Sequence, residues 1–325
     1  MKLGGERREV EAAQTRILNA KELYYDADYS AEDLPAFVRG GSSLRRRGEW
    51  WIIAQDDINA LALVRADASR ETRAALLPRG AGGCRTFGPS LGNKPDKMDL
   101  EASVVLPDGR YVAFGSGSTP RRDTLVVLDE AEQVRLVDGA SWYDALRAQT
   151  EFSGTQLNIE GALIVDDELW LFQRGNSLES PNAIGVLELA DFVAWLDGAP
   201  PPTLSHIQHL SLGSINGVPY TFTDAERTPD GRVYFLGSAE DTDDAYEDGA
   251  LHGTILARFE GTDLRTATVT STLILEPDGT PSLRKIEGLS YDSGGGDTNA
   301  PLRFWAVTDD DDEADPCELL LLEWR

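Results

Sequence analysis

The sequence is poor in the residues that make disulfides or zinc sites. Only two cysteines, Cys84 and Cys317, occur in 325 residues, and a single pair is not a disulfide framework. We therefore expect two unpaired thiols and a cytoplasmic location. Of the three histidines, His206 and His209 follow a proline-rich segment and lie in a predicted strand, where their spacing points them to opposite faces. No zinc site is expected.

Long apolar runs are also absent. No segment reaches the roughly 18 apolar residues that a membrane helix needs, and residues 1–18 carry charges where a signal peptide has an apolar core. We therefore expect neither a membrane partner nor secretion.

Positive charge is scarce. The chain has 30 basic and 56 acidic side chains, a formal net charge of −26, and only five of the basic residues are lysines. A nucleic acid would need a basic face, so it is excluded as a partner. Small-molecule ligands, protein partners and divalent cations stay open, and solubility is the simpler explanation of the acidity. We expect a monomer.

Short strand pairs around tight turns dominate the rest. In residues 99–118 two strands, 103–106 and 110–114, flank a Pro-Asp-Gly turn, in which Gly109 supplies the positive φ. An acid, Glu101, stands just before the first strand. Two helices are also predicted, at 141–152 with Ser141 as N-cap and at 191–198.

The acid-strand-turn-strand pattern returns at Glu160 and Glu287. Glu101 and Glu160 are 59 residues apart, and Glu160 and Glu287 are 127 apart, which is two units with a shifted copy between them. Each unit holds about four short strands, as in the blades of a β-propeller. The sequence predicts an all-β fold with five blades, with six as the alternative.

Two strands at the chain ends are left without partners. Residues 15–25 precede the first unit, and residues 317–325 end the last one a strand short. Their pairing would close the ring and remove exposed sheet edges. We expect residues 1–15 to be a flexible leader and residues 16–325 to be a single propeller domain.

The repeated motif, Asp or Asn, any residue, Glu, then Gly or Ala before a strand, resembles that of bacterial phytase-like and esterase-like propellers. The segment TDAERTPDGRVYFLGSAEDTDDAYEDG (223–249) more closely resembles a family of uncharacterised bacterial propellers. The resemblance implies a toroid whose inner strands carry acids into a central channel, often with calcium. The chain lacks the dense Lys, Arg and His set that would hold several phosphates, which argues against phytate as a substrate.

Equal positions in related blades converge on the axis, so three glutamates should meet at one end. Their mutual repulsion requires a cation, arginines or a retained proton. The predicted metal ligands are Glu101, Glu160, Glu287, Asp99, Asn158 and Asp224. The predicted ligand-binding residues are Arg174, Asn176, Arg121, Arg122 and Lys97. No catalytic residue is assigned.

Two functions follow. One is a small-molecule-binding or ester- or phosphoester-hydrolysing propeller with a calcium-assisted site at one channel mouth. The other is a non-enzymatic interaction platform whose glutamates are structural latches. The acidic runs 240–248 and 309–315 lack the spacing of a calcium loop and are interpreted as solvated loops.

Overall fold

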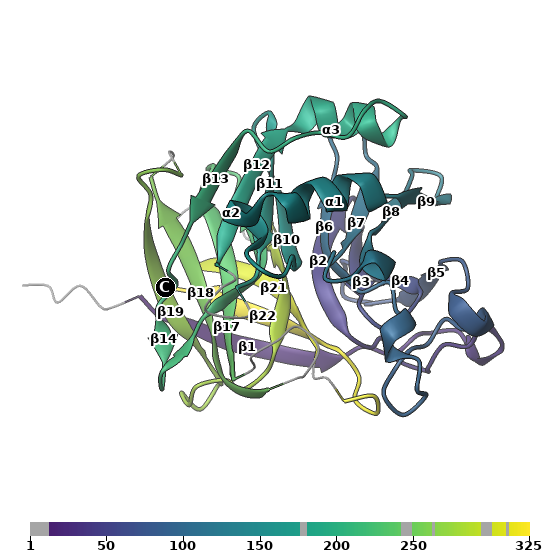
Figure 1. Ribbon diagram of the computed structural model, residues 1–325. Coiled ribbons are helices and arrows are strands. Elements are labelled where there is room, and N and C mark those ends of the chain that lie inside the picture. The colour runs from purple at the N-terminus through teal and green to yellow at the C-terminus, as the bar shows by residue number, and fades with distance from the viewer. Residues whose placement is uncertain (1–12, 176–180, 242–248, 262–263, 294–300, 310–311) are drawn as a thin grey trace, which may run out of the picture.

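The computed structural model describes residues 13–175, 181–241, 249–261, 264–293, 301–309 and 312–325. Within these ranges the chain forms successive groups of four antiparallel strands (Figure 1). Most of the expected leader, residues 1–12, lies outside the described residues, and the first strand begins at Thr15.

Four groups use strands in chain order. The first two are β2 (Gly41–Arg47), β3 (Trp50–Gln55), β4 (Ala60–Arg65) and β5 (Thr72–Leu76), then β6 (Leu100–Val105), β7 (Tyr111–Gly115), β8 (Thr124–Leu128) and β9 (Val134–Asp138). The next two are β10 (Ile159–Val165), β11 (Glu168–Gln173), β12 (Ala183–Glu188) and β13 (His206–His209), then β16 (Thr221–Arg227), β17 (Val233–Asp241), β18 (Ala250–Glu260) and β19 (Thr268–Leu275).

The fifth group combines both ends of the chain. It consists of β20 (Ile286–Tyr291), β21 (Leu302–Thr308), β22 (Glu318–Trp324) and β1 (Thr15–Glu22). β1 pairs antiparallel with β22, from Thr15 opposite Trp324 to Glu22 opposite Glu318. It also pairs parallel with β19 over two residues, which joins the fourth and fifth groups into one eight-stranded sheet.

The remaining elements are short. They are the hairpin β14 (Ser214–Ile215) and β15 (Val218–Pro219), the helices α1 (Ala140–Ala148), α2 (Thr150–Ser153) and α3 (Leu189–Leu196), and the 3-10 turns η1 (Ser30–Glu32), η2 (Ala81–Gly83), η3 (Lys94–Asp96) and η4 (Pro120–Arg122). In the described ranges no helix has both the length and the apolar character that a membrane crossing requires.

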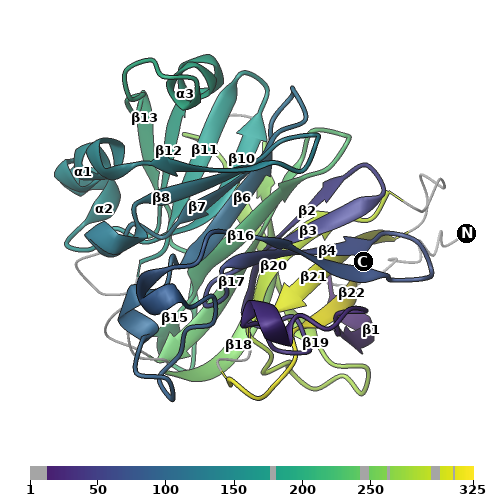
Figure 2. The same ribbon diagram turned by 90° about the vertical axis from the view of Figure 1, so that its right-hand side faces the viewer.

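The first strands of the five groups contact one another in a cycle. β2 contacts β6, β6 contacts β10, β10 contacts β16, β16 contacts β20, and β20 contacts β2. Figure 2 shows these strands near the middle of the molecule, with later strands of each group farther out. Residues at the same position of these strands therefore face a common centre.

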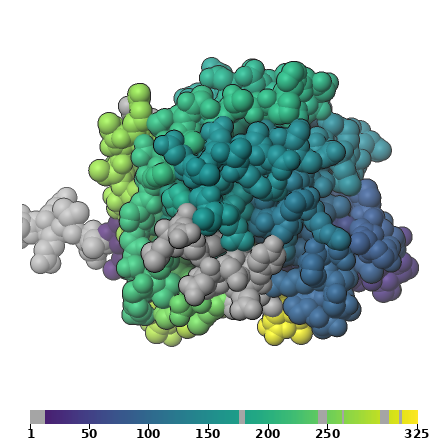
Figure 3. Space-filling model, in the orientation of Figure 1, coloured from purple at the N-terminus to yellow at the C-terminus, as the bar shows by residue number. Residues whose placement is uncertain are grey.

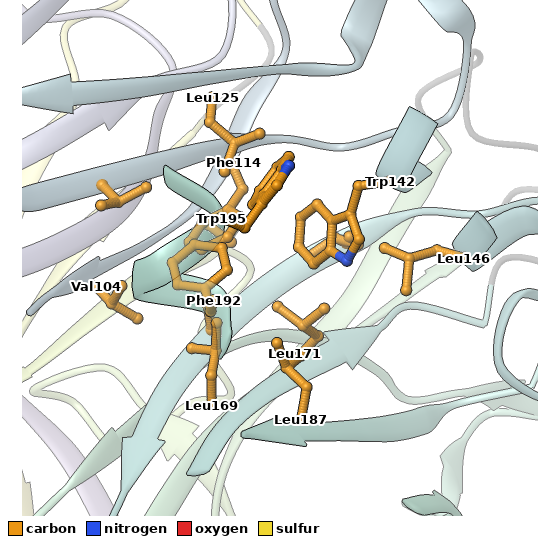
Figure 4. Close-up of a cluster of buried hydrophobic side chains, with 14 of the residues drawn as sticks. Val104, Phe114, Leu125, Trp142, Leu146, Leu169, Leu171, Leu187, Phe192 and Trp195 are labelled. Atoms are coloured by element: carbon orange, nitrogen blue, oxygen red, sulfur yellow. The ribbon is translucent and has the colours of Figure 1, made fainter. Parts of the chain in front are cut away.

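Apolar residues fill the space between consecutive groups. Separate clusters lie between the first and second groups, the second and third, the third and fourth, the fourth and fifth, and the fifth and first. The largest includes α1, α2 and α3 and contains the rings of Trp142, Phe192, Trp195 and Phe114 (Figure 4). In the space-filling view, teal atoms of this region form a continuous upper face (Figure 3). The groups thus pack face to face, as β-sheets with two apolar faces must.

The helix predicted at 141–152 is present as α1 and α2, but its expected N-cap is wrong. The N-cap residue is Gly139, which has no side chain with which to cap the first turn. Asp138 Oδ1 accepts a hydrogen bond from Ala140 N at 3.0 Å instead. Ser141 already lies inside the helix.

Each first strand carries a β-bulge near its beginning. The register with the neighbouring strand shifts by one residue, which leaves one residue of the first strand extra. The extra residues are Ser42, Glu101, Glu160, Thr223 and Glu287. A bulge redirects a side chain, so the same position in all five strands is turned toward one end of the central ring.

Candidate functional site

The bulges bring the three repeated glutamates together at one end of the ring. Arg174, which directly follows β11, lies with Nη1 at 3.4 Å from Glu160 Oε1 and at 3.7 Å from Glu287 Oε1. Glu101 is close enough to both for their charges to raise its pKa. All three glutamates are buried. We call this end the acidic mouth.

Arg174 is the central cation of the acidic mouth. Besides Glu160 and Glu287 it binds Glu240, with 2.5 Å between Nη2 and Oε2. Glu240 belongs to β17, so one guanidinium links the third, fourth and fifth groups. The Arg174 Nε atom is buried and has no hydrogen-bond partner among the described residues.

Lys285 adds a second cation beside Glu287. Its Nζ lies 3.5 Å from Glu287 Oε1 and 3.6 Å from Asp309 Oδ2. Burial raises the pKa of Glu287 well above its usual range, and the Asp309 and Glu160 charges add to this, while Lys285 and Arg174 oppose it.

The residue two places before each glutamate also lies in the mouth. These residues are Asp99, Asn158 and Lys285. Asn158 donates from Nδ2 to Glu160 Oε1 at 2.7 Å, so it orients that carboxylate. The shared offset is the sequence signal that would have identified Lys285 as a site residue.

Lys97 and Arg122 form ion pairs with Asp56 and Asp99. Lys97 Nζ pairs with Asp56 and lies 2.7 Å from Asp99 Oδ1, while Arg122 Nη1 lies 2.7 Å from Asp99 Oδ2. Ser116 also donates to Asp99. Although burial opposes it, the two cations lower the pKa of Asp99 to about 2, so this carboxylate is ionised at any ordinary pH.

Glu101 differs from the other described acids of the mouth because no cationic side chain in the described ranges pairs with it. Its side chain is 8% exposed, and among the described residues its carboxylate takes part in no hydrogen bond and no ion pair. Burial raises its pKa well above the usual value, and repulsion by Glu160, Asp99, Asp56 and Glu287 adds to the increase. Oxygen atoms of Asp56, Asp99 and Glu101 lie within 4.8 Å of one another.

The described residues of the acidic mouth include more acids than bases. The described acids are Asp56, Asp57, Asp99, Glu101, Glu160, Glu240, Glu287 and Asp309. The described bases are Arg39, Lys97, Arg122, Arg174 and Lys285. Arg39 pairs with Asp57, and burial raises the pKa of Asp57 to about 8. The excess of carboxyl groups therefore requires bound protons or a bound cation.

Asp224 does not share the partners of the three glutamates. It follows the bulge of β16 by one residue, so the true counterpart of the glutamates is Thr223. Its Oδ1 and Oδ2 accept from Arg45 at 2.6 and 2.7 Å, and Oδ2 also accepts from Leu289 N at 2.9 Å. The one-residue shift, which the sequence pattern had not resolved, gives Asp224 a different role.

Arg45 forms a plug across the ring. Its guanidinium donates to Asp224 of β16 and to a main-chain carbonyl of each other first strand. The carbonyls are Leu44 O at 2.7 Å, Ser103 O at 2.8 Å, Ala162 O at 2.9 Å and Leu289 O at 2.9 Å. One side chain thus binds all five first strands. Sequence reasoning missed it, because nothing local separates Arg45 from its neighbours Arg46 and Arg47.

Two other predicted ligand-binding residues lie elsewhere. Arg121 has a 65% exposed side chain and pairs with Asp96, so it stays at the surface. Asn176 lies outside the described residues. The two acidic runs were expected to be solvated loops, but the first residue of each lies in the acidic mouth. Glu240 pairs with Arg174, and Asp309 pairs with Lys285. Their middle parts, 242–248 and 310–311, are also outside the described ranges.

Comparisons with solved structures returned several enzymes at low identity. A gluconolactonase from Xanthomonas campestris aligns with a TM-score of 0.43 and 12% identity, over 94% of this chain and 98% of its own. An α-L-arabinanase from Penicillium chrysogenum has a TM-score of 0.44 and 8% identity, over 88% and 97%. The PQQ-bound aldose sugar dehydrogenase of Streptomyces coelicolor has a TM-score of 0.42 and 12% identity, over 96% and 98%.

No curated protein matched the sequence. A family model, described as a family of unknown function (DUF6929), matches residues 37–323. These residues include every strand from β2 to β21 and the whole acidic mouth. The chain therefore belongs to the DUF6929 family.

Proposed function

We propose that this protein is a five-bladed propeller that binds a calcium ion at its acidic mouth and, through that site, an oxygen-rich small molecule. The cycle of five first strands and the pairing of β1 with β22 support the blade count and the closure of the ring. The observation that carries the calcium site is Glu101, a buried carboxylate that lies beside Asp56 and Asp99 and has no hydrogen-bond or ion-pair partner among the residues that the structure describes.

The residues fit calcium in kind. Calcium binds carboxylate and carbonyl oxygens. Asp56, Asp99 and Glu101 would supply the carboxylate oxygens. Lys97 competes with the ion because its ammonium already lies between the two aspartates. When bound, the ion would supply Lewis-acid polarisation of a carbonyl or phosphoryl oxygen. Hydrolysis of an ester or phosphoester is the corresponding reaction class.

Binding of calcium is the direct test. Titration calorimetry on chelator-treated protein should show one calcium per chain. Glu101→Gln should lower the affinity at least tenfold, and Lys97→Gln should raise it because the competing cation is removed. Glu130→Gln, at an exposed carboxylate outside the mouth, is the matched control and should change nothing. Absence of calcium binding, or equal binding by Glu101→Gln, would reject the site.

Ester hydrolysis is tested separately. Turnover of p-nitrophenyl acetate or p-nitrophenyl phosphate should require calcium and should fall with Glu101→Gln. Calcium binding without any turnover would leave a binding protein and exclude the hydrolase for these substrates.

The alternative is a non-enzymatic interaction platform with structural glutamates. Arg174 supports it, because this one guanidinium holds Glu160, Glu240 and Glu287 and thereby ties three groups of strands together. If the protein is an interaction platform, calcium should leave its melting temperature unchanged. If it has the calcium site, a free calcium concentration about one hundred times the dissociation constant should raise the unfolding free energy by about 2.7 kcal/mol. We place either function in the cytoplasm, in a monomer.

A further inference from the structure

A cavity of about 330 Å³ lies at the other end of the first strands. Its walls come from the ends of β2, β6, β10 and β16, whereas the acidic mouth uses the beginnings of β6, β10 and β20. Between Glu101 and Val105 alone the strand advances by roughly 13 Å. The cavity is therefore separate from the acidic mouth.

Arg45 also lines this cavity, but its hydrogen-bond donors are not available to a ligand. Its three nitrogen atoms all donate to Asp224 or to main-chain carbonyls. A molecule in the cavity must therefore bind the other lining residues.

Two arginines in the walls have spare hydrogen-bond donors. Arg227 uses Nη2 for Asp166 at 2.9 Å, but its Nε is buried and has no partner within the described residues. Arg46 uses Nε for Gly48 O at 3.2 Å and Nη1 for Ser293 Oγ at 3.1 Å. A guanidinium has five N–H donors, so, counting partners within the described ranges, each arginine retains donors for an anion.

The remaining walls are mostly aliphatic. Val104, Leu163 and Ile164 line the cavity beside the arginines. A ligand that satisfies both kinds of wall has an apolar body and a compact negative group, since a planar carboxylate matches the donor fork of arginine.

Glu226 is the one acid among the described residues that line the cavity, and it does not exclude an anion. Arg227 N donates to its Oε1 at 3.1 Å. Burial raises its pKa to about 7; Arg45 opposes the increase, and Asp224, on the same strand, adds to it. The raised pKa favours the protonated form, which carries no negative charge to repel an anion and can donate a hydrogen bond to it.

We propose that this cavity is a second ligand site, which takes a small carboxylate with an aliphatic body. The carboxylate is held by Arg227 and Arg46, and the aliphatic chain lies against Val104, Leu163 and Ile164. The site does not depend on the calcium proposal, because none of the described residues of the acidic mouth lines this cavity.

Calorimetric titration with hexanoate at pH 6 tests the site on the full chain. We expect one hexanoate per chain, with 1-hexanol and hexylammonium at least tenfold weaker. Equal binding of 1-hexanol, tighter binding of hexylammonium or no binding of hexanoate would overturn the proposal.

Variants of the two arginines test whether they hold the carboxylate. Arg227→Gln should weaken hexanoate at least tenfold, while Arg232→Gln, on the same hairpin with a 55% exposed side chain, should not. Arg46→Gln, at an exposed residue, repeats the test if Arg227→Gln fails to fold. Unchanged affinity in a folded arginine variant of the cavity would contradict the assignment.

Discussion

Replacement of Arg45 by methionine should strongly destabilise the protein, because this one buried side chain binds all five first strands. Methionine has a similar length and fills much of the same space, but it donates no hydrogen bond. The change leaves Asp224, which is 0% exposed, as a buried charge without its cation. It also removes donors from the carbonyls of Leu44, Ser103, Ala162 and Leu289.

The expected loss is large relative to the stability of a domain. Removing one partner of a buried ion pair costs about 3–5 kcal/mol, and each carbonyl left without a donor adds up to about 1–3 kcal/mol unless water enters. Since unfolding free energies are about 5–15 kcal/mol, Arg45→Met should lose at least about 4 kcal/mol and approach unfolding.

Urea unfolding at pH 7 measures the loss. Arg46→Met is the control, because this neighbouring residue is exposed and its loss should cost less than about 1 kcal/mol. Asp224→Asn should also destabilise the protein. The double variant should lose less unfolding free energy than the sum of the two single losses, because neither residue then leaves its partner as an unpaired buried charge. If Arg45→Met and Arg46→Met unfold at the same urea concentration, the plug does not stabilise the ring.

Two further predictions concern stability. Burial raises the pKa of Glu226 from about 4.5 to about 7 in the folded protein, so the folded state binds the proton more tightly than the unfolded state does. The free energy of unfolding should therefore fall by about 2–3 kcal/mol as the pH rises from about 4.5 to above 7. Urea titrations between about pH 5 and 8 measure this pH dependence, and Glu226→Gln should reduce it. Deletion of residues 317–325 removes the strand that pairs with β1, together with the buried side chains of Leu320 and Leu322. Burial of each leucine stabilises the fold by up to about 2 kcal/mol. The truncated protein should therefore be insoluble, or its circular dichroism spectrum should be that of an unfolded chain. A soluble, cooperatively melting truncation would contradict the role of this pairing.

The strand content and the meeting of charges could be predicted from local patterns. Alternating apolar residues around turns such as the one at Gly109, which has φ +87°, specify strand pairs because each strand has two faces and each turn a fixed geometry. The spacing of Glu101, Glu160 and Glu287 pointed to related positions, and the bulges put them at one end of the ring. The resemblance to phytase-like and esterase-like propellers stays a prediction.

The sequence alone determined an acidic chain of repeated strand pairs, because turn chemistry and apolar alternation act between near neighbours. Only the tertiary structure decided which charges neutralise one another. Arg45 meets Asp224 across 179 positions, and Arg174 meets Glu240 across 66. Such pairs depend on how whole sheets pack around a common axis, and a one-residue bulge decides whether an acid such as Asp224 faces the plug or the mouth. That register is a property of packed strands, which no short stretch of sequence contains.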